Sequence, residues 1–118
     1  MTNNLEKGKK GELIAKSHII SKGYSILATN YRNKIGEIDI IALDNTTLVF
    51  IEVKTRTGTS YGYAYEAVNR KKQQKILSCS QLYLLENNLK ETQLRYDIIE
   101  VYLTKDIKIN HIENAFCW

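Results

Sequence analysis

Two apolar runs joined by a short polar turn constrain this chain more than any other feature of its sequence. Residues 38–43 and 48–53 are rich in β-branched side chains, and residues 44–47 between them are typical of a turn. The pattern predicts an antiparallel hairpin. Each run also carries an acid within its apolar stretch, Asp39 in the first and Glu52 in the second. Charges buried in strands are costly unless a partner compensates them.

The predicted register brings these two acids together on one face of the hairpin. If the runs pair from the turn outward, Asp39 lies opposite Glu52 with the Cβ atoms about 5 Å apart. Glu37 then pairs with Lys54 on the same face. Facing carboxylates repel each other, and a hard divalent cation such as Mg²⁺ or Mn²⁺ turns that repulsion into attraction. The alternative interpretations are ion pairs with nearby basic residues, or a one-residue slip that separates the acids.

The spacing of these charges is similar to the motif of the PD-(D/E)xK nuclease superfamily. The resemblance implies a restriction-endonuclease-like core and an Mg²⁺ or Mn²⁺ ion held by Asp39, Glu52 and the backbone carbonyl of Val53. It also implies that Lys54 serves the attacking water and the scissile phosphate. The proline that precedes the aspartate in that superfamily is Ile38 here, which removes no ligand.

Short blocks along nearly the whole chain resemble the YraN family, small bacterial proteins similar to Holliday-junction resolvases. The blocks are Gly11-Glu12, Gly23-Tyr24, Asn30-Tyr31-Arg32, residues 36–39, residues 50–56, Arg95-Tyr96-Asp97 and Asn114-Ala115-Phe116. The resemblance implies a shared fold, but a fold alone does not determine a reaction.

Glu12 is a further candidate for the site. On a helix it shares a face with Leu5, Ala15 and Ile19, so we expect it to point inward. Resolvase-like nucleases carry a first-helix glutamate that supports the metal site, and the resemblance assigns Glu12 to this catalytic position. The alternative is an exposed pair with Lys16, four residues further along the helix.

The element order predicts an α/β protein with a mixed sheet flanked by helices. One domain, residues 1–118, accounts for the length of 118 residues. The order is α-β-β-β-α-β-β, with helices over 4–22 and from 64 or 69 to 86, a loop over 55–63, and strands over 24–30, 38–43, 48–53, 96–103 and 107–112. Gly23 is expected to close the first helix, and the last strand to lie at an edge of the sheet.

Basic residues follow the predicted hairpin and begin the second helix. The formal net charge of +4 and the pI near 9.0 favour an anionic partner. The residues expected to contact DNA phosphates are Arg56, Arg70, Lys71, Lys72 and Lys75, with Lys72 expected to reach the site itself. A solvated helix face is the alternative for this run. Tyr61 and Tyr63 either stack on unpaired bases or cover the edge of the core.

The sequence indicates a cytoplasmic protein with no membrane contact. It has no apolar run long enough to span a bilayer and no apolar core of a signal peptide. Its two cysteines, Cys79 and Cys117, are too few for a disulfide framework, and we expect reduced thiols.

These features predict a metal-dependent endonuclease that hydrolyses DNA phosphodiester bonds, with branched DNA implied by resemblance only. The alternatives are a noncatalytic nucleic-acid-binding module with the same fold and a structural partner protein without affinity for nucleic acid. Symmetric cutting needs two sites, so a homodimer is expected, through the edge strand over 107–112 or the chain end 115–118.

Overall fold

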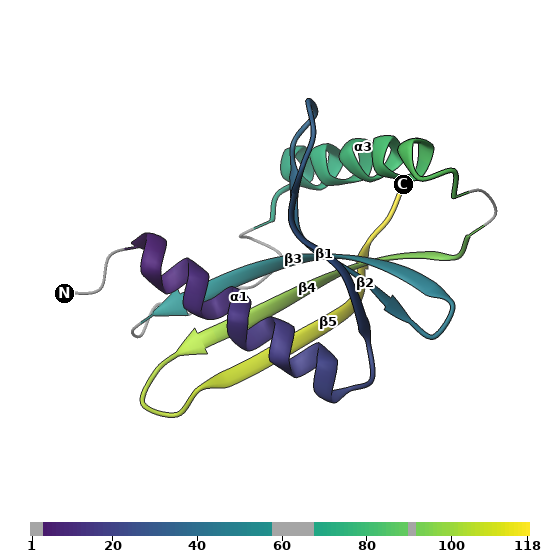
Figure 1. Ribbon diagram of the computed structural model, residues 1–118. Helices are drawn as coiled ribbons and strands as arrows, with labels where there is room; N and C mark the ends of the chain where they lie inside the picture. Colours follow the sequence, from purple (N-terminus) through teal and green to yellow (C-terminus); the bar gives the residue numbers. More distant parts are fainter. Residues whose placement is uncertain (1–3, 58–67, 90–91) are drawn as a thin grey trace.

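The described part of the protein forms a five-stranded mixed sheet with a helix on each face, as the computed structural model in Figure 1 shows. The structure describes residues 4–57, 68–89 and 92–118. Within them the elements are α1 (Asn4–Ser21), β1 (Ser25–Arg32), β2 (Glu37–Asp44), β3 (Thr47–Thr57), α3 (Arg70–Glu86), β4 (Leu94–Leu103) and β5 (Lys108–Phe116). This is the predicted order. The strands lie in the order β1-β2-β3-β4-β5, so β5 is an edge strand as expected.

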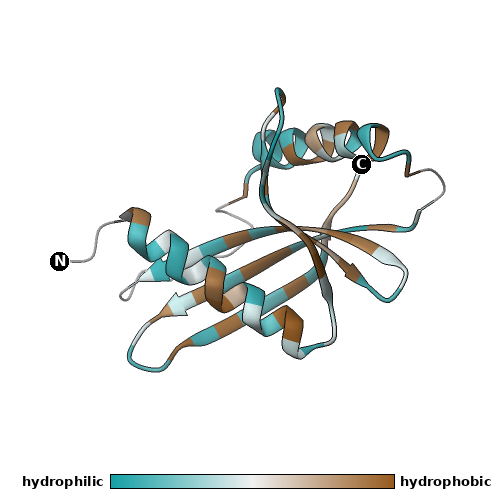
Figure 2. Ribbon diagram, viewed as in Figure 1, coloured by the Kyte–Doolittle hydropathy of each residue, from teal (hydrophilic) through white to brown (hydrophobic). Residues whose placement is uncertain are grey.

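The sheet is antiparallel except between β3 and β4, which run parallel. A parallel pair needs a long crossover connection, and the segment containing α3 provides it. Helix α1 covers one face through Ala15 and Ile19, and α3 covers the other through Ile76 and Cys79. Apolar residues therefore run along the central strands, as Figure 2 shows, and these strands are buried on both sides.

The helix boundaries follow from residues that the sequence displays. Gly23 ends α1 with a φ of +93°, a left-handed conformation that glycine adopts without strain. Asn69 caps α3, because its side chain accepts a hydrogen bond from the backbone N–H of Lys72 at 2.9 Å. The structure thus supports the later of the two predicted starts, and residue 64 lies outside the described residues.

The predicted loop over residues 55–63 begins later than expected. Strand β3 continues to Thr57 because β4 pairs with it throughout, with Lys54 opposite Glu100 and Arg56 opposite Tyr102. A parallel partner that is distant in the sequence leaves no local signal, so the end of the apolar run was a wrong guide to the end of the strand. The remainder of that loop, including Tyr61 and Tyr63, lies outside the described residues.

The β1–β2 hairpin bends sharply at its centre, and its tip rises toward α3 (Figure 1). Asn30 has a left-handed φ of 51° within β1. Across from it, Ile38 packs in the α3 core and Ile40 in the α1 core, although residues two apart in a regular strand share a face. Strand β2 therefore turns over at Asp39. The β2–β3 ladder ends at the pair Ile40–Ile51, and the two strands diverge beyond it.

The chain end is only partly exposed. Phe116 is 8% exposed and stacks on Tyr96 with ring centroids 5.5 Å apart, whereas Trp118 is 65% exposed. Of the expected dimer surface at the chain end, Phe116 is thus packed within the monomer, whereas Cys117 and Trp118 stay exposed. Cys79 and Cys117 are free thiols, as predicted. The helices that the structure describes are too short or too polar to cross a bilayer.

Candidate functional site

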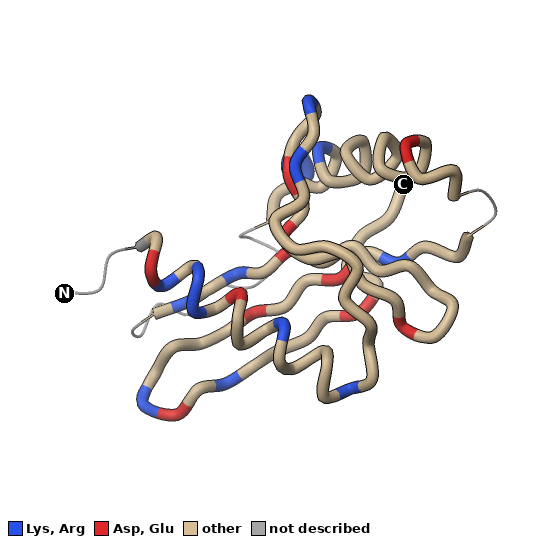
Figure 3. The backbone as a smooth tube through the Cα atoms, in the orientation of Figure 1, with Lys and Arg blue, Asp and Glu red and all other residues tan. Residues whose placement is uncertain are grey.

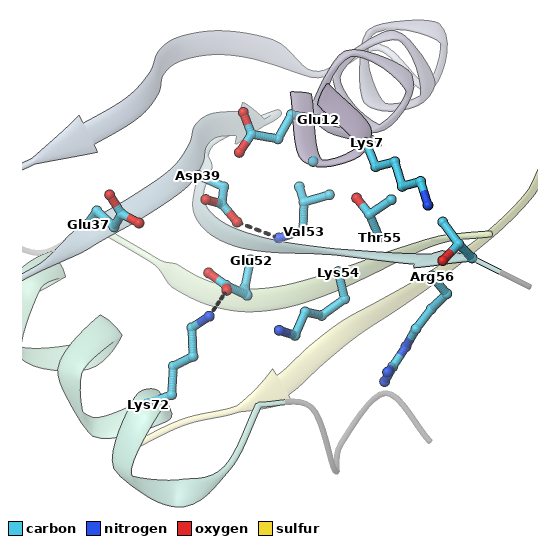
Figure 4. A pocket seen from close by; sticks show the side chains of 12 residues that line it. Lys7, Glu12, Glu37, Asp39, Glu52, Val53, Lys54, Thr55, Arg56 and Lys72 are labelled. Carbon is cyan, nitrogen blue, oxygen red and sulfur yellow. Dashed lines mark hydrogen bonds and ion pairs between the residues drawn. The ribbon is translucent and has the colours of Figure 1, made fainter. Parts of the chain in front are cut away.

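A cleft of about 360 Å³ opens where β2 and β3 diverge. Figure 4 shows its lining side chains, which come from the start of α1, from β2 and β3, and from the start of α3. The charged lining residues are Lys7, Glu12, Glu37, Asp39, Glu52, Lys54, Arg56 and Lys72. Acidic and basic positions gather at this end of the sheet, beside the N-terminal part of α1 (Figure 3). The cleft lining therefore contains four acidic and four basic residues, and its formal net charge is close to zero.

The predicted register holds up to the mouth of this cleft. The pairs nearest the turn form as expected, down to Ile40 with Ile51. Asp39 and Glu52 are not ladder partners, which corrects the prediction, and neither are Glu37 and Lys54. All four side chains nevertheless line the cleft. The bend at Asp39 separates the backbones and leaves space between them, which a regular hairpin would have closed.

Asp39 is half-buried in the cleft lining, beside the acids Glu12 and Glu52. Its Oδ2 accepts the backbone N–H of Val53 at 2.8 Å. Burial first, then the negative charge of Glu52, raises the pKa of Asp39 to about 8. Because the N–H and C=O of one residue in a strand point to the same edge, the Val53 carbonyl also lies on the side that faces Asp39. The two carboxyl groups and the strand edge that carries this carbonyl thus border the same cleft.

Glu52 is balanced by a lysine from the opposite helix. Its side chain is 6% exposed, and its Oε1 lies 2.5 Å from Nζ of Lys72. Burial acts against the charge on Lys72, but the hydrogen bond and attraction to Glu52 outweigh it and raise the pKa of that lysine. Lys54 lies beside them, and burial together with the Lys72 charge lowers its pKa. The predicted approach of Lys72 to the site is therefore observed.

Glu12 reaches the cleft because α1 lies unusually close to β3. A Cβ atom on Gly11 would lie 1.9 Å from Oγ1 of Thr55, so only glycine allows this approach. Burial raises the pKa of Glu12, and a hydrogen bond from Asn30 partly opposes that rise. The alternative of an exposed pair with Lys16 is not what the structure shows, since Glu12 is half-buried and faces the cleft.

Asn30 is a site residue that the sequence prediction missed. Its left-handed backbone lies across from the point where β2 turns over, and its side chain bonds Glu12. Asparagine is among the few residues other than glycine that tolerate this conformation, which is the only signal the sequence offered. Lys7 was also missed, because nothing local distinguishes it from the other lysines of the first helix.

The predicted nucleic-acid-binding residues fall into two groups. Arg56 and Lys72 line the cleft. Arg70, Lys71 and Lys75 are exposed on the first turns of α3 and lie outside the cleft lining. The structure thus brings the first two to the site and leaves the other three on the adjoining surface.

The chain matches the model of the uncharacterised protein family UPF0102 over residues 11–101. It belongs to this family. A UPF0102 protein of Clostridioides difficile (strain 630) is 50% identical over 114 residues, which cover 97% of this chain and 99% of the relative. A UPF0102 protein of Alkaliphilus oremlandii is 53% identical over 116 residues, covering 96% and 99%. The match confirms the resemblance to the YraN family and extends over nearly the whole length of these UPF0102 relatives.

The donor atoms at the cleft of this UPF0102 protein are of the kind that hard divalent cations prefer. The described residues contain no group of three or more His, Cys, Asp or Glu side chains placed to hold a metal ion. Asp39, Glu52 and the Val53 carbonyl form a smaller set, made only of oxygen donors, which suits Mg²⁺ or Mn²⁺. Burial and the neighbouring charge of Glu52 raise the pKa of Asp39, and a bound cation would favour its charged form. The set therefore fits such an ion.

Proposed function

We propose that this UPF0102 protein is a metal-dependent endonuclease with a restriction-endonuclease-like fold that hydrolyses phosphodiester bonds in DNA. The observation that carries the proposal is the pair of half-buried Asp39 and buried Glu52 beside Lys54, in a cleft formed by strand divergence. A structural role gives no reason to hold two carboxyl groups close together in a cleft, where each disfavours the charge of the other. Strongly perturbed acids in a cleft are instead typical of functional sites.

Each residue of the cleft has a definite part in this proposal. Asp39, Glu52 and the Val53 carbonyl hold Mg²⁺ or Mn²⁺, which when bound supplies Lewis acidity toward phosphate and water. Lys54 directs its ammonium group at the charge that develops on the phosphate oxygens. Glu12 supports the site from α1, where Asn30 fixes its carboxyl group. Close packing of Gly11 against Thr55 sets the distance of Glu12 from the strands.

The charge around the cleft supports a nucleic-acid substrate. Arg56 and Lys72 lie within the cleft, and further cations follow on the exposed start of α3. These basic side chains could contact successive phosphates of a nucleic-acid strand that leaves the cleft along α3. DNA, and branched DNA in particular, is proposed from the resemblance to resolvases. A homodimer through the β5 edge would present two such sites for paired cuts.

A noncatalytic nucleic-acid-binding module is the second candidate. One observation favours it, namely that Lys72 already neutralises Glu52, so the acid has a partner without any metal. In that case the cleft would hold phosphate between Lys54 and Lys72 and would cut nothing. The two candidates make different predictions for Asp39, because only catalysis needs a second carboxyl group at that point.

The deciding experiment incubates the purified protein with plasmid, single-stranded and four-way-junction DNA in Mg²⁺, Mn²⁺ or EDTA. We expect cleavage with metal and none with EDTA. Asp39→Asn and Glu52→Gln should abolish cleavage, whereas the matched control Asp106→Asn, in the exposed β4–β5 turn, should keep it. DNA binding without cleavage under any metal would establish the binding module. Neither binding nor cleavage would exclude both candidates.

A further inference from the structure

The ion pair between Lys72 and Glu52 joins two parts of the protein that otherwise have separate roles. Lys72 stands at the start of α3, where its backbone N–H is fixed at 2.9 Å to the Asn69 side chain. Its side chain crosses to β3, and its Nζ lies 2.5 Å from Glu52 Oε1, as the dashed line in Figure 4 shows. The side chain of Lys72 is 43% exposed and that of Glu52 only 6%. The buried acid is fixed in place, and the lysine is the half that can move.

Glu52 requires a positive partner at all times. Leaving a buried carboxylate without one is strongly unfavourable. A divalent cation on Glu52 would meet this need, but it would also lie next to the ammonium of Lys72 and repel it. Lys54 adds a further positive charge nearby, and its lowered pKa reflects both burial and Lys72. The ammonium of Lys72 and a bound cation therefore compete for the same carboxylate.

We propose that Lys72 couples the binding of nucleic acid to the binding of the divalent cation. This inference rests on the function proposed above. In the free protein the Lys72 ammonium neutralises Glu52 and weakens cation binding there. When a substrate phosphate draws the ammonium away, Glu52 becomes available and the cation binds more tightly. Linkage makes the effect reciprocal, so bound cation strengthens the grip of Lys72 on phosphate by the same factor.

The long flexible stem of lysine suits this exchange. Lysine carries a point charge on four methylene groups, and it can change partner while its backbone stays in place. The fixed backbone at the helix start keeps the ammonium within reach of both Glu52 and the cleft. Lys71 and Lys75 are exposed neighbours on the same helix and do not line the cleft. Because they belong to the surface proposed to bind DNA, the control for general charge effects is Lys105, which is exposed in the β4–β5 turn and lies outside the cleft lining.

The first experiment measures Mn²⁺ binding to the free protein by isothermal titration calorimetry. Lys72→Met removes the ammonium and keeps an apolar stem, so we expect Mn²⁺ to bind about tenfold more tightly than to the wild type. Lys72→Arg should remain close to the wild type, because it keeps the positive charge. Lys105→Met, in the exposed β4–β5 turn, should also leave the affinity unchanged within about twofold. Thermal melting of each variant checks that it is folded.

The second experiment repeats the titration with DNA present, in a Lys54→Met background chosen to suppress cleavage. A DNA oligonucleotide should tighten Mn²⁺ binding about fivefold or more in that background. The same DNA should leave Mn²⁺ affinity unchanged in the double variant Lys54→Met/Lys72→Met. Equal Mn²⁺ affinity in the wild type and the folded Lys72→Met protein would overturn the coupling while leaving the nuclease proposal intact. A failure of Mn²⁺ to bind any of these proteins would instead overturn the proposed function.

Discussion

Two aspartates of the same sheet, Asp97 fully buried and Asp39 half-buried, differ in the groups that surround them. Asp97, on β4, is 0% exposed, and it accepts hydrogen bonds from Arg95 and from the backbone N–H of Asn114, both at 2.9 Å. His111 Nε2 lies 2.8 Å from its second oxygen. Asp39, on β2, accepts one backbone N–H and lies beside the acids Glu12 and Glu52, while Lys54 and Lys72 attract it from a greater distance than a salt bridge. The two sites lie toward opposite ends of α1, with Glu12 near one and His18 near the other.

The difference appears in the direction of the two pKa shifts. Burial acts to raise the pKa of Asp97, but the hydrogen bonds from His111 and Arg95 outweigh it, and the pKa is lowered. At Asp39 burial and the charge of Glu52 act together, and the pKa rises to about 8. Burial alone therefore does not identify a functional acid. An acid whose surroundings satisfy it supports the fold, and one left without positive charge is available to a ligand.

The largest expected effect is a loss of protein stability on replacing Asp97, the aspartate that is fully hydrogen-bonded. Asp97→Ala should lower the free energy of unfolding by about 3–5 kcal/mol, because it leaves Arg95 and other buried donors without their shared acceptor. Denaturant unfolding followed by circular dichroism measures this. Asp106→Ala, in an exposed turn, is the control. A loss below about 1 kcal/mol, in the range of a surface ion pair, would remove the distinction between the two aspartates.

The second largest effect concerns catalysis in the cleft that contains Asp39. Lys54→Met should lower the cleavage rate about 10²–10³-fold, the usual cost of losing one group that stabilises transition-state charge. Mn²⁺ affinity should not fall, because lysine donates no metal ligand and its removal takes a positive charge away from Glu52 and Asp39. Single-turnover cleavage and calorimetry on the same preparation test the two statements together. Parallel losses of rate and of metal affinity would contradict the role given to Lys54.

The pH dependence of stability should separate the two aspartates by sign. The folded pKa of Asp39 is about 8 against an ordinary 3.8, so its contribution is present below about pH 4 and is lost as the pH rises to 8. Asp97 has a lowered pKa, so its contribution is present above its ordinary 3.8 and is lost as the pH falls further. Asp39→Asn should match the wild type near pH 4 and exceed it by about 2–3 kcal/mol at pH 8. Urea titrations across this range would show the opposite sign if Asp39 were satisfied like Asp97.

The smallest effect concerns the exposed cations beside the site. Replacing both Lys71 and Lys75 with Gln should lower the slope of log K against log salt for DNA binding by about two units. Lys22, which pairs with Glu113 near the Asp97 network, is the control, and Lys22→Gln should leave the slope unchanged. Fluorescence anisotropy at several salt concentrations measures the slopes. An unchanged slope in the double variant would place the DNA on another face, such as the lysines of α1.

Local pattern was sufficient for the element order and for the hairpin register as far as Ile40 and Ile51, because turn chemistry and β-branched runs are local properties. It was insufficient for the bend at Asp39, which depends on the left-handed conformation of Asn30 on a neighbouring strand. It also ended β3 too early, since the parallel partner β4 is far along the chain. The sequence singled out Asp39 and Glu52, but only the packing of α1 and α3 shows which groups surround them.

One measurement tests the central claim most directly, namely that Asp39 is held for a divalent cation at a cost to the fold. Thermal unfolding of the wild type and Asp39→Asn is compared at about pH 8, with and without Mn²⁺. Without metal, Asp39→Asn should melt at the higher temperature. Saturating Mn²⁺ should stabilise only the wild type, by about 2.7 kcal/mol when its concentration is a hundred times the dissociation constant. The difference in melting temperature between the two proteins should then disappear or change sign. A metal-free Asp39→Asn protein that melts below the wild type, with equal Mn²⁺ responses in both, would contradict the claim.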